Sequence, residues 1–501
     1  MHKPIRSFVF ALALFGFLAL LGLCFPEQGI SIAGYYTLRF PSTKDLLEPA
    51  EKQKDITRLL KAIDAIDTNF TVVPIKPGKL KHTSDSMPLV SPPASKPLKP
   101  SSPERIPELI TVLQSRNGKA LYRFYEALSS VQDFSTSIRV LHYGDSQIEG
   151  DRITDYLRLK LQAQFGGEGP GLISSMPLSQ SVVNRIEYST NWERFSTYTG
   201  RDRRVKHNNY GILAGFTRFL PAAGTEPLRT ITSASIGIVT RPQGGGNALN
   251  FSKIKMFYGG SRTRTWCEFY EGPALMKADS LEAGGVFRVK EFKIVSGTNR
   301  HVFRFRGKDS PDLYSLSLEG SSGVMVDNIA LRGSSGTFFH QINPEQLKAF
   351  FSYLNVKLII LQFGGNVMPS LLNDSMAVNY GQYLKYQISM VQKAAPGVSI
   401  LFIGPSDMAI KEGTEYVTYP LLEKVRDEIK AAVLESNCAF FDLYDCMGGR
   451  NSMAAWVEQN LAASDYIHFS PQGARKMAIM LYSAIINDYN NYLSKQPDAK
   501  P

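Results

Sequence analysis

The chain has 501 residues, of which 43% are apolar and 20% charged, a globular composition long enough for two or three domains. Its formal net charge of +11 favours an anionic partner such as an acidic glycan or a membrane surface, or serves solubility alone. Four cysteines without a CxxC pair exclude a disulfide scaffold and a zinc ribbon.

The N-terminus predicts a short cytoplasmic stub and a transmembrane anchor, together residues 1–25. Lys3 and Arg6 precede an uncharged apolar run, Phe8 to Phe25, which as a helix spans roughly 27 Å, close to the hydrocarbon thickness of a bilayer. Because basic residues stay inside, we expect attachment to the inner membrane and a catalytic domain exported to the periplasmic or extracellular face. A cleaved signal peptide is the alternative, although no A-x-A site follows the run. A lipoprotein signal ending at Cys24 is disfavoured, because the residue before the cysteine is not small.

Residues 26–106 are predicted to form a membrane-proximal segment and a linker. The stretch from Pro74 to Pro103 is rich in proline, serine and lysine, which predicts an extended, semi-rigid spacer without a core. At up to about 3.1 Å per residue, such a spacer can hold a domain tens of ångströms away from the membrane.

The rest of the chain is predicted to be an α/β domain that a β-rich segment interrupts. Residues 107–175 contain a helix-like segment, Leu109 to Leu128, then a short strand, Arg139 to Tyr143, and a second helix. Residues 176–325 lose the helical periodicity and show short alternating runs between glycine clusters, which predicts a sandwich or jelly roll. Residues 326–494 alternate apolar strands with helices, which predicts a parallel sheet with helices on both faces.

Two short motifs supply the residue types of an activated serine. Ser146, in Gly-Asp-Ser-Gln, follows a predicted strand and precedes a helix, where α/β folds place reactive groups. Asp465 stands three residues before His468, so its carboxylate can hold the imidazole within one turn. A base oriented in this way activates a hydroxyl that is otherwise a poor nucleophile. Each motif alone also fits an ordinary capped turn, so only their combination indicates a Ser146–His468–Asp465 triad.

Two glycine-containing loops follow other predicted strands. Asn366, in Gly-Gly-Asn, can donate its amide to an oxyanion, although a simple turn fits the same residues. The loop from Gly333 to Thr337 contains glycines that permit close backbone approach. No cluster of histidine, cysteine and carboxylate residues has metal-ligand spacing, so neither a metal nor a cofactor is expected.

Together, these segments resemble the four blocks of the SGNH (GDSL-like) hydrolase family. GDSQ is similar to its serine block, GSSGT to its glycine block, GGN to its asparagine block and DYIH to its closing D-x-x-H block. The resemblance covers residues 139–170 and 325–490, and it implies a flavodoxin-like three-layer α/β/α sandwich. One feature departs from the family, because the β-rich segment separates the serine block from the glycine block.

The resemblance also implies a role for each matching residue. Ser146 is the implied nucleophile, His468 the base and then the acid, and Asp465 the residue that orients the histidine. The implied oxyanion hole consists of the N–H groups of Ser146 and Gly336 and the side chain of Asn366.

Longer stretches resemble a bacterial subgroup that contains peptidoglycan O-acetylesterases and related O-acetyltransferases. They are HYGDSQIEGDRIT, FGGEGPGL, IGPSDM and FFDLYDCMGG. Some members of the subgroup carry a carbohydrate-binding-like β-domain at the position of residues 176–325. The implied substrate is an acylated cell-envelope polysaccharide, and a membrane acyltransferase is a candidate partner.

Three functions follow from these observations. The first is an esterase that removes acetyl or another small acyl group through an acyl-enzyme on Ser146. The second is an O-acetyltransferase that passes the acyl group to a glycan with the same triad. The third is a non-catalytic glycan-binding protein, which the intact triad disfavours. The basic charge has no accompanying nucleic-acid-binding motif, so no nucleic-acid partner is expected.

Four residues outside these motifs also lead to expectations. His142 is expected to pack or hydrogen-bond locally, and His340 to be solvated rather than part of a pocket. Cys438 and Cys446 are close enough in sequence to be bridged, a question that the sequence leaves open.

Overall fold

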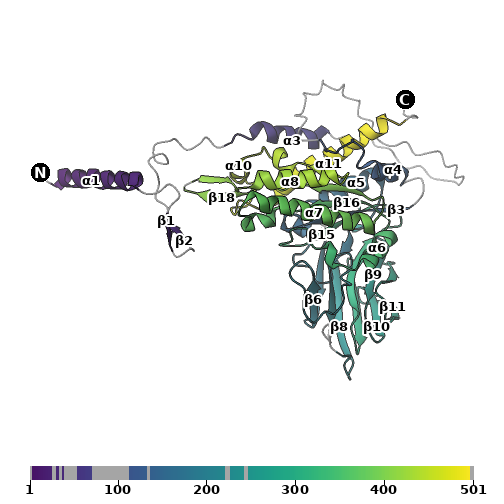
Figure 1. Cartoon of the computed structure of the whole chain (residues 1–501). Coiled ribbons are helices and arrows are strands. Elements are labelled where there is room, and N and C mark those ends of the chain that lie inside the picture. Colours follow the sequence, from purple (N-terminus) through teal and green to yellow (C-terminus); the bar gives the residue numbers. More distant parts are fainter. Residues whose placement is uncertain are drawn as a thin grey trace, which may run out of the picture.

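The structure is a computed structural model that describes residues 3–24, 30–32, 36–38, 54–69, 112–131, 136–219, 226–241, 246–413 and 415–496. The spacer predicted from Pro74 to Pro103 lies outside these residues. Figure 1 shows a helix-covered α/β domain from which a lobe of β-strands projects.

The α/β domain is built on a sheet of five parallel strands. Their order across the sheet is β15-β3-β16-β17-β20. Of the five strands, β3 comes first along the chain, and it lies between the second (β15) and the third (β16). This is the flavodoxin-like order, and it confirms the predicted parallel sheet. The strands are β3 (Ser137–Gly144), β15 (Gly323–Ala330), β16 (Val356–Gln362), β17 (Ser399–Ile403) and β20 (Ala439–Phe441).

Helices cover both faces of this sheet. Successive side chains of a strand face opposite sides, so Leu358 and Ile360 of β16 enter one hydrophobic cluster while Ile359 and Leu361 enter the other. The helices on the first face are α3 (Thr57–Asn69), α4 (Tyr122–Ser130), α5 (Thr154–Phe165) and α11 (Pro471–Ser494). Those on the second face are α6 (Pro344–Tyr353), α7 (Asp374–Ala394) and α8 (Leu422–Glu435).

The helix predicted from Leu109 to Leu128 is wrong in its first half, because α4 begins only at Tyr122. Gln114 instead exchanges two backbone hydrogen bonds, of 2.9 and 2.8 Å, with Phe440 of β20. The chain then turns at Gly118, whose φ of 67° is readily adopted only by glycine. Pairing with the sheet edge therefore replaces the first turns of the predicted helix.

The predicted β-rich insertion is a sandwich of two antiparallel sheets. The first has the order β11-β10-β13-β8-β5 and the second β12-β9-β14-β7-β6, with β4 also paired to β14. Phe269 and Phe303 lie between the sheets with ring centroids 4.9 Å apart, so an aromatic core holds the lobe together. The first sheet comprises β5 (Asn184–Tyr188), β8 (Thr232–Thr240), β10 (Thr265–Glu271), β11 (Ala274–Leu281) and β13 (Arg300–Gly307). The second comprises β4 (Gly171–Ile173), β6 (Trp192–Ser196), β7 (Gly215–Phe219), β9 (Lys253–Gly259), β12 (Arg288–Lys293) and β14 (Asp312–Glu319).

A buried ion-pair network joins the sandwich to the α/β domain. Arg139 of β3 pairs with Glu319 of β14 and, at 2.7 Å, with Asp327 of β15. The same Asp327 oxygen accepts a hydrogen bond of 2.7 Å from the N–H of Leu172 in β4. The first strand of the domain and the last strand of the insertion are therefore held at one buried point.

The remaining elements are short or lie near the N-terminus. They are α1 (Lys3–Cys24), β1 (Ile30–Ile32), β2 (Tyr36–Leu38), β18 (Ala409–Glu412), β19 (Glu415–Thr418), α9 (Leu443–Cys446) and α10 (Ser452–Glu458). Among the residues that the structure describes, no helix combines the length and the apolar character that crossing a bilayer requires. The transmembrane anchor predicted for residues 1–25 is therefore not confirmed.

Candidate active site

Ser146 begins the short 3-10 helix η2 (Ser146–Asp151), and only Asp145 separates it from the end of β3. The chain passes from β3 to β15 on one side and then to β16 on the other, so the ends of β3 and β16 flank a topological switch point. Open α/β sheets bind ligands at such points. As the first residue of η2, Ser146 also has an N–H group without an intrahelical acceptor. The fold therefore presents both the hydroxyl and the N–H of Ser146 in one crevice.

His468 lies in the loop before α11, 322 residues after Ser146 in the sequence, and contacts Ser146. Its Nε2 lies 2.8 Å from Ser146 Oγ, and its Nδ1 lies 2.8 Å from Asp465 Oδ2. Asp465 Oδ1 also accepts the backbone N–H groups of Ile467 and His468, at 2.9 and 3.0 Å. The loop is therefore shaped by the same carboxylate that orients the imidazole.

These bonds determine the charge of Asp465. Burial pushes its pKa up, but the hydrogen bonds from His468 and from the N–H of Ile467 outweigh that effect and leave the pKa below its ordinary value. The carboxylate therefore stays ionised at neutral pH and can stabilise an imidazolium on His468.

The two other predicted oxyanion donors already make hydrogen bonds within the protein. The N–H of Gly336 donates to Ser334 Oγ at 3.1 Å. The Asn366 amide nitrogen donates to Asp145 Oδ2 at 3.0 Å and to the Ser334 carbonyl at 3.1 Å. An ester oxygen must therefore share or replace these acceptors, and the oxyanion role of both residues stays a prediction.

Glycines form the backbone around these donors. Gly336 has a φ of 80°, and a Cβ at this position would lie 2.8 Å from the Phe363 ring. Gly364 has a φ of 130°, and a Cβ there would approach the Ile429 side chain to 3.0 Å. Larger residues would shift the two loops that carry the candidate donors.

Asp145 is a part of the site that the sequence did not single out. Its Oδ1 accepts the Gln147 N–H at 2.9 Å, which caps η2, while its Oδ2 holds Asn366. Because the carboxyl is buried, its pKa rises to about 6. One carboxylate thus connects the nucleophile segment to the candidate oxyanion asparagine.

Gln147 is a second residue that the sequence did not single out. Its Nε2 donates to the Ile467 carbonyl at 2.7 Å, and its Oε1 accepts the Phe469 N–H at 3.3 Å. These bonds lie on either side of His468. The residue that follows the nucleophile therefore fixes the histidine loop against it.

A cavity of about 150 Å³ opens beside the triad. Its lining includes Ser146, Asn366 and His468 together with apolar groups of Phe363 and Met408. Gly336 does not contribute to this lining. The space next to the nucleophile has room for a small acyl group or the edge of a sugar ring.

The other histidines and the cysteine pair lie outside the triad. His142 is buried between Thr154 and Gln362, at 2.9 and 3.1 Å, and burial lowers its pKa to about 4, which confirms the expected local role. His340 is exposed and contacts Gln387 at 3.0 Å. Cys438 and Cys446 are buried and are not joined by a disulfide, so the bridge that the sequence left open does not form.

Comparison with known proteins gives a likeness in structure only. The sequence matches no protein-family model and no curated protein. A solved peptidoglycan O-acetylesterase is 18% identical, with a TM-score of 0.58, and the match covers 74% of this chain and 96% of that one. An acetyl xylan esterase is 16% identical over 32% of this chain and 81% of its own, with a TM-score of 0.26. A family two carbohydrate esterase from Cellvibrio japonicus is 9% identical over 62% and 99%, with a TM-score of 0.22.

The first of these matches shows the fold. It spans nearly the whole length of the O-acetylesterase and about three quarters of this chain. The predicted resemblance to SGNH (GDSL-like) hydrolases with an O-acetylesterase-like relative is confirmed at this level.

Proposed function

We propose that this protein is a serine esterase that removes acetyl or another small acyl group from a cell-envelope polysaccharide. The observation that carries the proposal is the chain of two 2.8 Å contacts from Ser146 Oγ through His468 to Asp465. A serine–base–acid chain of this geometry is what nucleophilic attack on an ester requires.

The reaction proceeds in two halves. Ser146 Oγ attacks the ester carbonyl carbon while His468 Nε2 takes the hydroxyl proton. The carbonyl oxygen becomes an oxyanion that the N–H groups of Ser146 and Gly336 and the Asn366 amide stabilise. The carbon–oxygen bond to the sugar then breaks, the leaving oxygen takes the proton from His468, and an acyl-Ser146 ester remains.

Water completes the cycle. It attacks the acyl carbonyl and gives a proton to His468, and the bond to Ser146 Oγ breaks. Ser146 recovers its proton from the imidazole, and the carboxylic acid leaves. Asp465 stays ionised throughout and stabilises the transient imidazolium.

Support for a carbohydrate ester as substrate comes from the proteins that the fold resembles. The structural neighbour with a TM-score of 0.58 is a peptidoglycan O-acetylesterase, and the match covers 96% of its length. The stretches around the four blocks resemble the same subgroup. An exported location close to a membrane rests on the residues from Phe8 to Phe25 alone, and an acyltransferase partner rests on the family resemblance.

The exposure of the triad favours hydrolysis over transfer to a second sugar. The side chains of His468 and Asp465 are 33% and 46% exposed, so water reaches the base directly. A transferase has to exclude water from its acyl-enzyme. An O-acetyltransferase that uses the same triad is therefore the second choice, and a purely glycan-binding role leaves the triad contacts unexplained.

The test is hydrolysis of 4-nitrophenyl acetate by the full chain, beside Ser146→Ala and a control, Ser389→Ala, on helix α7. We expect Ser146→Ala to lower kcat by at least about 10⁴-fold, as loss of a triad serine does, and Ser389→Ala to leave it unchanged. Sugar acceptors added to the same assay distinguish transfer from hydrolysis. Equal activity in all three proteins, or none in a folded wild type, would sink the proposal.

A further inference from the structure

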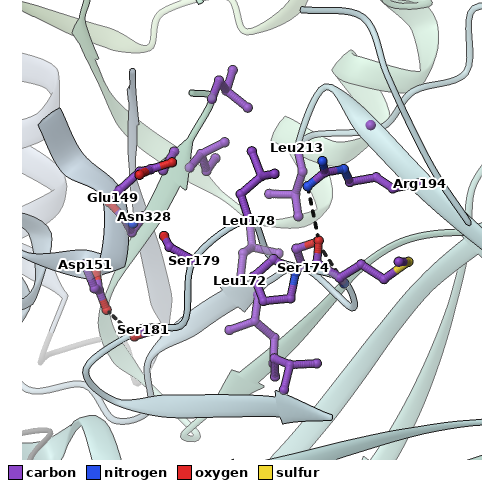
Figure 2. Close-up of a pocket in the computed structure, with 18 of the residues that line it drawn as sticks. Glu149, Asp151, Leu172, Ser174, Leu178, Ser179, Ser181, Arg194, Leu213 and Asn328 are labelled. Atoms are coloured by element: carbon purple, nitrogen blue, oxygen red, sulfur yellow. Dashed lines mark hydrogen bonds between the residues drawn. The ribbon is translucent and has the colours of Figure 1, made fainter. Parts of the chain in front are cut away.

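A second cavity of about 130 Å³ lies where the α/β domain meets the sandwich, and we name it the junction cavity (Figure 2). The α/β domain contributes the end of η2 and the residues from Asn328 to Leu331. The insertion contributes most of the residues between 170 and 181 and parts of β5, β6, β7 and β14. The junction cavity shares no lining residue with the cavity beside the triad.

Its two carboxylates are already compensated by neighbouring groups. Glu149 pairs with Arg332 through two contacts of 2.5 Å. Asp151 accepts bonds of 2.8 and 3.0 Å from Arg158 and one of 3.2 Å from Ser181. Neither carboxylate is therefore free to attract a cation.

Arg194 differs from the other charged groups of the lining. Its guanidinium makes one long hydrogen bond, of 3.5 Å, to the Met176 carbonyl, and in the described part of the chain no carboxylate lies within ion-pair distance of it. The Tyr198 hydroxyl and the Ser179 hydroxyl belong to the same lining and have no hydrogen-bond partner among the described residues. The junction cavity thus offers one uncompensated positive charge and two unused hydroxyl groups.

Apolar side chains separate the two polar ends of the junction cavity. Figure 2 shows Leu172, Leu178 and Leu213 between the Glu149 side and Arg194. A ligand that bridges the cavity must therefore bury apolar surface and also place an anionic group at Arg194. Because Arg194 is the one uncompensated positive charge in the described lining, a single negative charge fits better than a dianion such as a phosphate monoester.

We propose that the junction cavity binds a carboxylate-bearing, otherwise apolar substituent of the substrate, of the kind a short peptide with small apolar side chains provides. Arg194 pairs with the carboxylate, Tyr198 and Ser179 hydrogen-bond to it or to the neighbouring amide, and the leucines contact the apolar groups. The assignment to the substrate rests on the proposed function, whereas binding of the peptide itself does not.

The position of the junction cavity connects it to the triad. Glu149 lies three residues after Ser146 on η2, and its partner Arg332 begins the loop that carries Gly336. A glycan substituent held in the junction cavity would therefore lie beside the segments that carry the nucleophile and one oxyanion donor. The site would select esters on sugars that carry such a substituent.

The first test is calorimetric titration of the full chain with N-acetyl-alanyl-alanine and with its neutral C-terminal amide. We expect saturable binding of the acid below about 5 mM and binding of the amide at least tenfold weaker, since the amide cannot pair with Arg194. Arg194→Gln should weaken binding of the acid at least tenfold. The matched control is Arg306→Gln, an exposed arginine of the same lobe, and it should leave binding unchanged.

A second variant tests binding independently, in case Arg194→Gln misfolds. Leu178 is 41% exposed, so Leu178→Asp should fold normally and still weaken binding by repelling the carboxylate. Ser146→Ala should bind the acid as the wild type does, which separates this inference from the esterase proposal. No binding of the acid, equal binding of acid and amide, or an Arg194→Gln variant within twofold of the wild type would each overturn it.

Kinetics gives the final readout. Arg194→Gln should raise KM several-fold for acetylated glycans that carry a peptide carboxylate and leave kcat/KM for 4-nitrophenyl acetate unchanged. An equal loss on both substrates would contradict a substituent-binding role.

Discussion

The α/β domain and the sandwich are built from different kinds of contact. In the α/β domain, polar side chains at strand ends are held by hydrogen bonds between segments far apart in the chain, such as Ser146 and His468, which are 322 residues apart. In the sandwich, stacked aromatic rings such as Phe269 and Phe303 fill a hydrophobic core. Every residue of the candidate triad and of the candidate oxyanion hole therefore belongs to one unit, although the other unit interrupts its sequence.

Asn366→Ala should affect catalysis most among the changes that test this comparison. It removes a candidate oxyanion donor, so we expect kcat for 4-nitrophenyl acetate to fall about 100- to 1,000-fold. It also removes the hydrogen bonds to Asp145 and Ser334, so we expect the protein to lose about 1–3 kcal/mol of stability. The matched control is Asn373→Ala, which removes the N-cap of α7 and should cost about 1 kcal/mol of stability without lowering kcat. A fall of less than threefold for Asn366→Ala would remove this residue from the oxyanion hole.

Asp145→Asn should lower kcat less than Asn366→Ala does, and it should change the pH dependence of stability. An asparagine has one carbonyl oxygen and cannot accept from both Gln147 and Asn366, so we expect kcat to fall by up to about 100-fold through misplacement of the donor. The matched control is Asp407→Asn, which alters another buried aspartate with a pKa raised by burial and should leave kcat unchanged.

Thermal unfolding tests the pH dependence of the same variant. Burial raises the Asp145 pKa to about 6, so the folded protein holds this proton at a higher pH than the unfolded chain does. The contribution of Asp145 to the stability of the wild-type protein is therefore present at acid pH, and it is lost as the pH rises through about 6. We expect the Tm of Asp145→Asn minus that of the wild type to increase by several degrees between about pH 4.5 and pH 7. A constant difference would contradict the raised pKa.

Phe303→Ala should leave catalysis unchanged while destabilising the sandwich. The ring is fully buried, so its loss should cost about 3–5 kcal/mol of lobe stability. Circular dichroism against urea measures the loss, and kcat for 4-nitrophenyl acetate per folded molecule should stay within twofold of the wild type. A tenfold loss of kcat would show that the lobe takes part in the chemistry.

The residues that meet in the candidate triad are predictable from the sequence because each of the two motifs is local. Asp465 and His468 lie within one turn, and Ser146 follows a strand whose apolar pattern is plain. The parallel sheet and the β-rich insertion are predictable for the same reason, since periodicity and composition report on each strand separately. The helix predicted from Leu109 fails because pairing of Gln114 with Phe440, far along the chain, overrides local propensity.

The supporting contacts could not be predicted in this way. Gln147 meets the Ile467 carbonyl across 320 residues, and Glu149 meets Arg332 across 183. The bonds that occupy Asn366 depend on how the ends of three strands converge. The junction cavity forms where the two units meet, and no short motif in the sequence indicates Arg194.

Covalent labelling tests the central claim most directly. A fluorophosphonate reacts with an activated serine and forms a stable bond to its oxygen, and the labelled peptide is identified by mass spectrometry. We predict that the full chain is labelled at Ser146 and that His468→Ala abolishes the label, because the imidazole no longer takes the proton. Labelling at another serine, or equal labelling of Ser146 without His468, would contradict the triad.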